Sequence, residues 1–231
     1  MGKGTRSQLK EAARKGRIQV NGEVVKKADM KVNPSKDTVV FDGAAVTYVT
    51  MEYYMLNKPQ GVVSATEDNR YQTVVDLIDD KNRRDLFPVG RLDIDTEGLL
   101  IITNDGPLAH RLLAPKKHVD KIYFAICDGA VEDSAVSLFA EGIELPDGLK
   151  CLPAKLEILK REEREGRVFS EIHLTIREGK FHQVKRMMEA VGCPVVFLKR
   201  MTMGPIALDE TLKPGEYRPL TEKELEMLNQ L

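Results

Sequence analysis

The chain has 231 residues and a formal net charge of −1, with 42% hydrophobic and 31% charged residues. That length is enough for one large or two modest domains, and the composition lies outside the disordered range. No apolar run approaches the roughly 18 residues of a membrane span, and the start MGKGTRSQLK lacks the apolar core of a signal peptide. A membrane protein is therefore excluded.

The cysteines and histidines carry no metal-binding pattern. Cys127, Cys151 and Cys193 are odd in number, lie far apart and form no CxxC pair. A disulfide framework or a zinc site is not expected, which favours a reducing, cytoplasmic location. The four histidines also lack metal-ligand spacing, and neither a Walker loop nor a GxGxxG motif is present.

Charge is unevenly distributed along the chain. Residues 1–36 contain ten Lys or Arg and three Asp or Glu, whereas residues 128–149 contain six acids and no base. A separate basic lobe is typical of proteins that bind polyanions such as nucleic acids. A solvated run of charge is the alternative explanation.

The basic lobe is predicted to hold one helix and two hairpins. Residues 7–15 form the predicted helix, with Ser7 as its N-cap and Gly16 after its end. Asn21-Gly22 and Asp42-Gly43 each separate two β-prone runs, which is the strongest short-range signal for a hairpin. We expect a small domain of roughly 48 residues, near the lower size limit for independent folding.

The rest of the chain alternates single helices with runs of strands. This order favours an α+β fold with a mostly antiparallel sheet flanked by helices. Apolar runs and turn signals predict strands at 53–59, 97–105, 121–127, 154–159, 167–176 and 194–200. Caps and helical periodicity predict helices at 105–114, 132–143 and 181–192, and one after the capping box that Thr221 begins.

The loop GRLDIDTEGL, residues 90–99, is rich in polar side chains and leads into a buried strand. Loops on rigid sheets are frequent positions for reactive groups. The pair Asp93 and Asp95 is compatible with a catalytic carboxylate, with a site for a divalent metal, or with a loop that only caps the strand. Arg91 supplies a cation that would compete with a metal.

The segment REGKFHQVKRM, residues 177–187, places several bases around the start of a predicted amphipathic helix. Free N–H groups, the helix dipole and cationic side chains together favour an anion there. An ordinary helix with solvated Lys and Arg is the alternative. Lys185 lies next to the apolar stripe, and a partly buried lysine needs a carboxylate partner. Asp93 would be a suitable one.

Five motifs in order resemble one family over nearly the whole chain from about residue 5. They are YYMLNKPQGVVSAT, PVGRLDIDTEGLLIITNDG, HVDKIYFA, EGKFHQVKRM and PGEYRPLTEKE. The chain resembles the bacterial pseudouridine synthases that modify small-subunit (16S) ribosomal RNA. The resemblance implies an alpha-L RNA-binding domain at residues 1–48 and a catalytic domain at 52–231. The alpha-L domain usually begins with a further helix, which would be missing here.

The resemblance also implies roles for individual residues. Asp93 would be the catalytic carboxylate, Tyr123 would stack on the target uracil, and Lys185 would pair with Asp93. Asp95 is not expected to be catalytic. Contacts to RNA would come from Arg91, Arg6, Lys10, Lys15, Lys58, Lys180, His182 and Arg186, although the motif around Lys58 is expected to be mainly structural.

The implied reaction isomerises uridine without gain or loss of atoms, so no cofactor and no metal are expected. The expected partner is ribosomal RNA, either free or in a pre-ribosomal particle, and the expected oligomeric state is a monomer. Three alternatives stay open: the same reaction on 23S ribosomal RNA, a non-catalytic ribosome-binding or assembly protein, and a metal-dependent enzyme that uses both Asp93 and Asp95.

Overall fold

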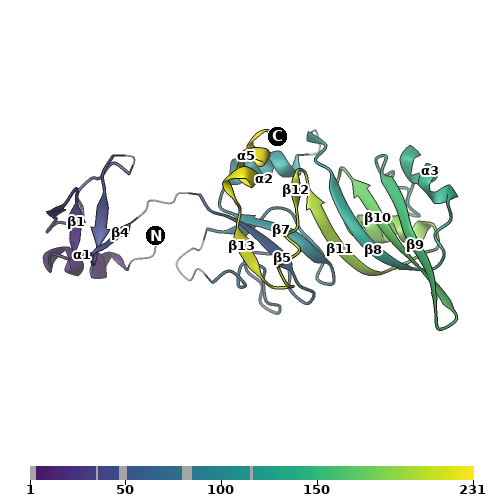
Figure 1. The fold of residues 1–231 in the computed structure, drawn as a ribbon, viewed down its shortest axis with the longest axis horizontal. Coiled ribbons are helices and arrows are strands. Elements are labelled where there is room, and N and C mark those ends of the chain that lie inside the picture. The colour runs from purple at the N-terminus through teal and green to yellow at the C-terminus, as the bar shows by residue number, and fades with distance from the viewer. Residues whose placement is uncertain (1–3, 35, 47–50, 80–84, 115–116) are drawn as a thin grey trace. The chain divides into compact units, whose positions relative to one another are not determined.

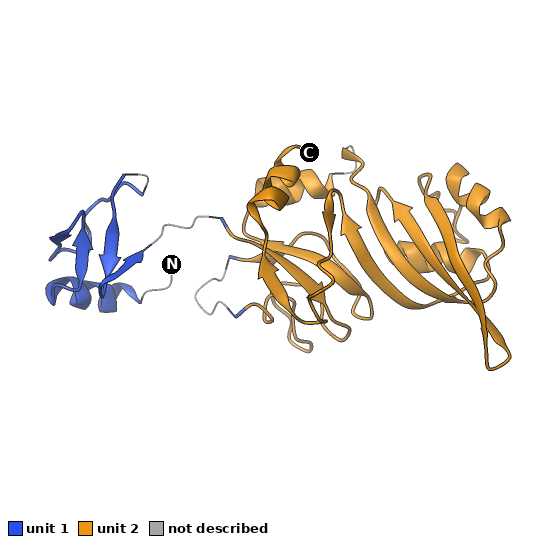
Figure 2. Cartoon of the chain, viewed as in Figure 1, with its two compact units in different colours: residues 1–51, 79–85 blue, residues 52–78, 86–231 orange. Residues whose placement is uncertain are grey.

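The computed structural model describes residues 4–34, 36–46, 51–79, 85–114 and 117–231 (Figure 1). The chain divides into two compact units (Figure 2). Unit 1 consists of residues 1–51 and 79–85, and unit 2 of residues 52–78 and 86–231. The predicted end of the first domain at residue 48 falls within 47–50, outside the described residues.

Unit 1 has a helix and a small antiparallel sheet. The helix α1 (Arg6–Arg14) begins one residue before the prediction, because Thr5 and not Ser7 caps it. The Thr5 side chain accepts from the Gln8 N–H, and the Gln8 side chain accepts from the Thr5 N–H. The sheet has the order β2-β1-β3-β4, from β1 (Ile18–Val20), β2 (Glu23–Val24), β3 (Val39–Phe41) and β4 (Ala44–Val46).

Both predicted hairpins of unit 1 are confirmed. Residues Asn21, Gly22, Asp42 and Gly43 all have positive φ, between 51° and 86°. Turns of two residues need this left-handed backbone, which Asn, Asp and Gly adopt at the least cost. The local turn chemistry was therefore sufficient to predict the two hairpins, whereas the pairing of β1 with β3 that joins them was not predicted.

Unit 2 is built on one nine-stranded sheet, most of whose pairs are antiparallel, as expected for the α+β class. Its main path runs β13-β5-β7-β11-β8-β10-β9, with β6 beside β7 and β12 beside β11. The strands are β5 (Tyr53–Lys58), β6 (Phe87–Pro88), β7 (Glu97–Thr103), β8 (Lys121–Asp128), β9 (Lys155–Arg164), β10 (Arg167–Ile176), β11 (Val195–Met203), β12 (Ile206–Ala207) and β13 (Tyr217–Pro219).

The helices of unit 2 are α2 (Gly106–Leu113), α3 (Ser134–Glu141), α4 (Gln183–Ala190) and α5 (Glu222–Asn229). The predicted caps of α2 and α5 are confirmed: Asp105 accepts from the Leu108 N–H, and Thr221 forms a capping box with Glu224. None of the described helices has the length and apolar character needed to cross a membrane.

Strand β7 is covered on both faces, which explains its continuous apolar sequence. Because successive residues of a strand point to opposite faces, Leu100 and Ile102 join one apolar cluster while Leu99 and Ile101 join the other. All four side chains are fully buried. The strand that follows the GRLDIDTEGL loop is therefore held firmly in the middle of unit 2.

The parallel pair β7–β11 joins the two antiparallel halves of the sheet. In this pair Gly98 lies opposite Arg200. Gly98 has φ +104°, and a Cβ atom there would lie 2.3 Å from the Arg200 carbonyl oxygen. Only glycine allows so close an approach of the two backbones.

Candidate active site

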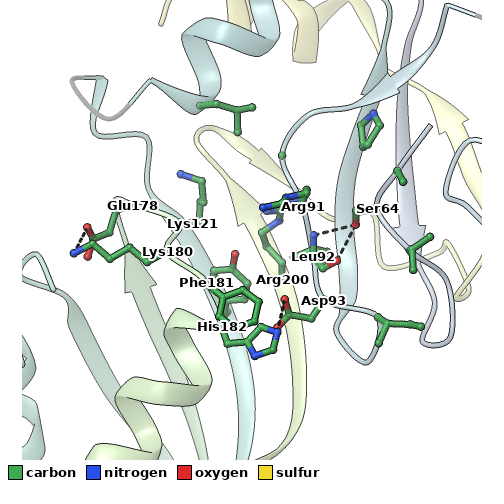
Figure 3. A pocket seen from close by; sticks show the side chains of 18 of the residues that line it. Ser64, Arg91, Leu92, Asp93, Lys121, Glu178, Lys180, Phe181, His182 and Arg200 are labelled. Atoms are coloured by element: carbon green, nitrogen blue, oxygen red, sulfur yellow. Dashed lines mark hydrogen bonds and ion pairs between the residues drawn. The ribbon is translucent and has the colours of Figure 1, made fainter. Parts of the chain in front are cut away.

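An open cleft with a volume of about 1030 Å³ lies in unit 2 (Figure 3). Its lining comes from segments that are far apart in the sequence, and all of them belong to unit 2. They are residues 63–66, 88, 90–94, 113, 121, 123, 152, 177–182 and 200. The GRLDIDTEGL loop forms one wall of this cleft, and the KFH segment before α4 forms another.

Hydrogen bonds from Lys58 and Ser64 hold the backbone of the loop that carries Asp93. The Lys58 ammonium donates to the backbone carbonyls of Pro59, Asp93 and Thr96, each at 3.0 Å. The Ser64 hydroxyl donates to the Leu92 carbonyl at 2.9 Å and accepts from the Leu92 N–H at 3.0 Å. These bonds fix the backbone on either side of Asp93.

Burial of Lys58 argues against its expected contact with RNA. The residue is fully buried and its ammonium is occupied by three carbonyls. Burial lowers its pKa to about 8, although the charges of Asp95 and Asp93 act in the opposite direction. Lys58 is therefore a structural residue beneath the Asp93 loop, which agrees with the mainly structural role expected of its motif.

The Lys185 ammonium and the His182 imidazole both lie close to the Asp93 carboxylate. The Lys185 ammonium lies 3.1 Å from Asp93 Oδ2 and 2.6 Å from Asp95 Oδ1, so it bridges the two carboxylates. His182 Nε2 lies 3.6 Å from Asp93 Oδ1, and Figure 3 shows the imidazole beside this carboxylate. The expected proximity of Lys185 and Asp93 is thus present in the structure.

The shared ammonium has consequences for the ionisation of its partners. Burial alone would lower the pKa of Lys185, but its hydrogen bonds to Asp95 and Asp93 and their charges raise that pKa above its ordinary value. The hydrogen bond from Lys185 is also the largest cause of the lowered pKa of Asp95. Asp95 therefore stays ionised and helps to hold Lys185 in its charged form.

Helix α4 positions Lys185 through its buried face. Val184, Met187 and Met188 are buried on the core side, which leaves Lys185 partly exposed and in contact with Asp93 and Asp95. The helix begins later than predicted because His182 has a left-handed backbone with φ +48°. The Phe181 ring stacks on the His182 imidazole with centroids 3.7 Å apart, and Phe181 is 73% exposed.

Tyr123 and Arg91 both line the cleft, and both also line a smaller recess of about 70 Å³ next to Asp93. Tyr123 comes from β8, whose residues alternate between the core face and the other face, and it is only 8% exposed. Arg91 is exposed and precedes Asp93 in the same loop. The cleft therefore presents an aromatic ring, a carboxylate and a free cation to one region.

The remaining predicted RNA contacts differ in their surroundings. Lys180 lines the cleft, but its ammonium is engaged by Glu178 at 3.0 Å and by the Lys150 carbonyl. Arg186 forms an ion pair with Asp147 and does not line the cleft. Arg6, Lys10 and Lys15 are exposed on or next to α1 in unit 1. Their contacts with RNA remain predictions.

Sequence reasoning missed two buried basic residues of the cleft, Lys121 and Arg200. Both line it and both are buried. Each lies in a predicted apolar strand, at 121–127 and 194–200, so the only available signal was a charged residue inside a strand that should be buried. Buried charges of this kind are rare unless they are paired or functional.

The fold and the cleft define a class of enzyme, which the comparisons identify. Residues 52–190 match the family model described as RNA pseudouridylate synthase, and residues 1–39 match the S4 domain model. The chain belongs to the RNA pseudouridylate synthase family and is an RNA pseudouridine synthase with an N-terminal S4 domain. The resemblance seen in the sequence is confirmed at this level.

Relatives with similar sequences cover almost the whole chain. An uncharacterized RNA pseudouridine synthase of Bacillus subtilis, YtzG, is 47% identical over 99% of this chain and 95% of its own. Ribosomal small subunit pseudouridine synthase A of Escherichia coli K12 is 42% identical over 92% of this chain and 89% of its own. A crystal structure of a pseudouridylate synthase is 41% identical with a TM-score of 0.71, covering 97% and 94% of the two chains.

Proposed function

We propose that the protein converts one uridine of 16S ribosomal RNA to pseudouridine, with Asp93 as the catalytic carboxylate. Two relatives at 41–42% identity carry the name ribosomal small subunit pseudouridine synthase A, which supports the choice of substrate. The observation that carries the proposal is the Asp93 carboxylate at the cleft, held by Lys185 beside the buried Tyr123.

The reaction breaks the bond between ribose C1′ and uracil N1, turns the base, and forms a bond between C1′ and C5. The C5 proton is released and a proton is taken up at N1, so atoms balance without an oxidant, a nucleotide or a metal. Asp93 would act either as the nucleophile or as the base that removes a proton. The fixed loop backbone and the Lys185 ammonium would keep its carboxylate aimed at the reacting atoms.

The target uridine has to leave its stack before it reaches Asp93. Extrusion of a base costs a few kcal/mol. Stacking on the Tyr123 ring would offset part of that cost, and phosphate contacts along the cleft would offset more.

The substrate would place the enzyme in the cytoplasm, and a monomer remains the expected state.

Tritium release from 16S ribosomal RNA labelled at uracil C5 tests the proposal. Asp93→Asn should abolish release, because the amide can neither attack nor remove a proton. Asp95→Asn is the matched control and should keep release within about tenfold of the wild type, since Lys185 would then pair with Asp93 alone.

Other results would favour the alternatives. Release from 23S but not 16S ribosomal RNA would change the substrate, and no release from any ribosomal RNA would favour a binding or assembly protein. Equal losses in the two variants would support the metal hypothesis. The structure argues against that hypothesis, because the Asp93 and Asp95 carboxylates share the Lys185 ammonium.

A further inference from the structure

Arg200 is a buried cation that lines the cleft and, among the described residues, has fewer hydrogen-bond partners than donors. It is 2% exposed and is the bulkiest fully buried side chain in the described part of the chain. Its Nε–H donates to the Leu99 carbonyl at 2.8 Å, but its buried Nη2 has no hydrogen-bond partner among the described residues. A buried guanidinium group with an unused donor is costly unless something else binds there.

Lys121 is a second buried cation on the same face of the sheet. Lys121 and Tyr123 are two residues apart in β8, so they point to the same side. Arg200 in β11 lies directly opposite Tyr123. Lys121 is 7% exposed, and its ammonium has one hydrogen bond, to the Val119 carbonyl at 3.1 Å. All three residues line the cleft.

In the described part of the chain, no carboxylate lies in salt-bridge contact with Lys121 or Arg200. Among the described residues, neither Lys121 nor Arg200 takes part in an ion pair, and the nearby Asp120 is bonded to Arg177 at 2.8 Å. Burial lowers the pKa of Lys121 and the charge of Arg200 lowers it further, while the charge of Asp120 acts in the opposite direction. Two adjacent buried cations without an anion are unfavourable in the free protein. Their arrangement is therefore suited to a ligand that brings negative charge.

We propose that Arg200 and Lys121 form an anion subsite that binds a phosphodiester of the RNA substrate next to the target uridine. Arg91, at the exposed side of the cleft, would be its third cation (Figure 3). A guanidinium group matches two phosphate oxygens at once, and the ammonium adds a point charge. The inference rests on the proposed function, because it names the part of the RNA that this cleft would hold.

The subsite would couple backbone binding to base extrusion. Tyr123 lines the cleft together with Lys121 and Arg200, and it also lines the recess next to Asp93. A phosphate on Arg200 and Lys121 would thus fix the sugar of the target nucleotide within reach of both residues. Lys121 and Arg200 are positioning residues in this account, and Asp93 is the catalytic residue.

A cycle that combines protein and RNA changes tests the contact directly. In the RNA, the phosphates on either side of the target uridine are replaced one at a time by neutral methylphosphonates. In the protein, Lys121→Met removes the ammonium at similar length, and Lys160→Met removes an exposed ammonium on β9 as the control. Dissociation constants and single-turnover rates are measured for every combination.

We expect one methylphosphonate to weaken binding to the wild type and to Lys160→Met by about tenfold or more, the scale of a charged hydrogen bond. Lys121→Met should bind the native RNA with a similar loss, and the same methylphosphonate should then cost less than about threefold more. The affinity of Lys121→Met for RNA should also depend less on salt concentration, by the amount expected for about one phosphate contact. Arg200→Lys keeps the positive charge but loses the guanidinium group that can bind two phosphate oxygens at once. In this variant the methylphosphonate should have an intermediate effect on binding.

Independent losses would overturn the subsite. If the methylphosphonate at either position weakens Lys121→Met as much as the wild type, the ammonium and the phosphate do not meet. Far-ultraviolet circular dichroism and thermal melting check that each variant is folded. Active wild type without this coupling would overturn the subsite alone, whereas an inactive wild type on every ribosomal RNA would overturn the proposed function.

Discussion

The single ammonium group of Lys185 forms ion pairs with the carboxylates of both Asp93 and Asp95. Its nitrogen is closer to Asp95, at 2.6 Å, than to Asp93, at 3.1 Å. Asp95 is 63% exposed in its side chain whereas Asp93 is 29% exposed. The more exposed carboxylate therefore takes the shorter bond and leaves Asp93 an oxygen that is not committed to Lys185. This division of the charge explains why two similar residues can have different roles.

We predict that Lys185→Met lowers the single-turnover rate by about a hundredfold or more, because Asp93 loses the cation that holds it. Lys185→Arg should recover part of that rate, since its charge is kept while its geometry differs. The measurement is pseudouridine formation at saturating enzyme, with Lys223→Met on α5 as the charge-matched control. Equal rates for Lys185→Met and the control would contradict a role for Lys185 at Asp93.

At the scale of residues, the motifs predicted that Lys185 lies next to Asp93, and the structure has this contact. Tyr123 lines the same cleft as Asp93, and the roles of all three residues stay predictions. The motifs could not show that Lys58 is buried. A lysine can be buried there because three backbone carbonyls, two of them from the Asp93 loop, accept hydrogen bonds from its ammonium. Arg200 was missed for a related reason. Its place in the cleft depends on the register of β11 against β8, which no local pattern reveals.

At the scale of elements, the contact between β7 and β11 decides where the Asp93 loop lies. Gly98 is the first buried residue of β7, and its Cα faces the backbone of Arg200. The same glycine thus determines the position of the Asp93 loop and of the proposed anion subsite. Any side chain at residue 98 would push the two strands apart.

We predict that Gly98→Ala destabilises the protein by more than about 2 kcal/mol, because a Cβ would meet the Arg200 backbone and the positive φ is unfavourable for alanine. Gly106→Ala, in the first turn of α2, is the control: no atom lies within 4 Å of its added Cβ, and its stability should change by less than about 1 kcal/mol. Urea denaturation measures both. Similar midpoints for the two variants would refute the steric argument.

Helix α5 should be sensitive to acid. Hydrogen bonds from Arg218 lower the pKa of Glu224 to about 2, and Glu224 also closes the capping box with Thr221. Since this pKa lies below its ordinary value of 4.5, the stabilisation is complete above about pH 4.5 and disappears as the pH falls towards 2.

Glu224→Gln should therefore lower the free energy of unfolding by about 1–2 kcal/mol at pH 7. The difference between the variant and the wild type should shrink steadily between pH 4.5 and pH 2. Thermal melts over this pH range provide the measurement. A difference that is constant with pH would mean that the Glu224 charge does not contribute.

The sequence predicted the longer elements well and the shortest poorly. The strands of unit 2 from β5 to β11 that have six or more residues were all predicted, because each carries its own apolar or alternating pattern. Strands β6, β12 and β13 have two or three residues and were not predicted. Segments of that length are strands only because a neighbouring strand supplies their hydrogen bonds.

At the scale of the whole molecule, unit 1 carries much of the positive charge. Residues 1–36 have a net charge of +7 in a chain whose total is −1. The S4 domain match to residues 1–39 agrees with the RNA-binding role that was expected of this lobe. Exposed cations of this kind give affinity for RNA that depends on salt and carries little sequence information.

We predict that replacing Arg6, Lys10 and Lys15 together by glutamine weakens binding of ribosomal RNA and reduces the salt dependence. The slope of log affinity against log salt should fall by about 0.7 for each phosphate contact that is lost, or about 2 in all. The control replaces Lys160, Lys213 and Lys223 in unit 2. An unchanged slope in the first variant would show that α1 does not grip phosphate.

The sheet order of unit 2 has a consequence for how the protein folds. The first strand, β5, pairs with the last, β13, and Asn57 donates to the Leu212 carbonyl 155 positions further along the chain. Contacts between residues so far apart in the sequence form slowly, because a long loop must close before they add stability. During synthesis, β5 would leave its edge unpaired until β13 is made. This edge of the sheet would thus be completed only late in synthesis, and an unpaired strand edge is prone to aggregation until then.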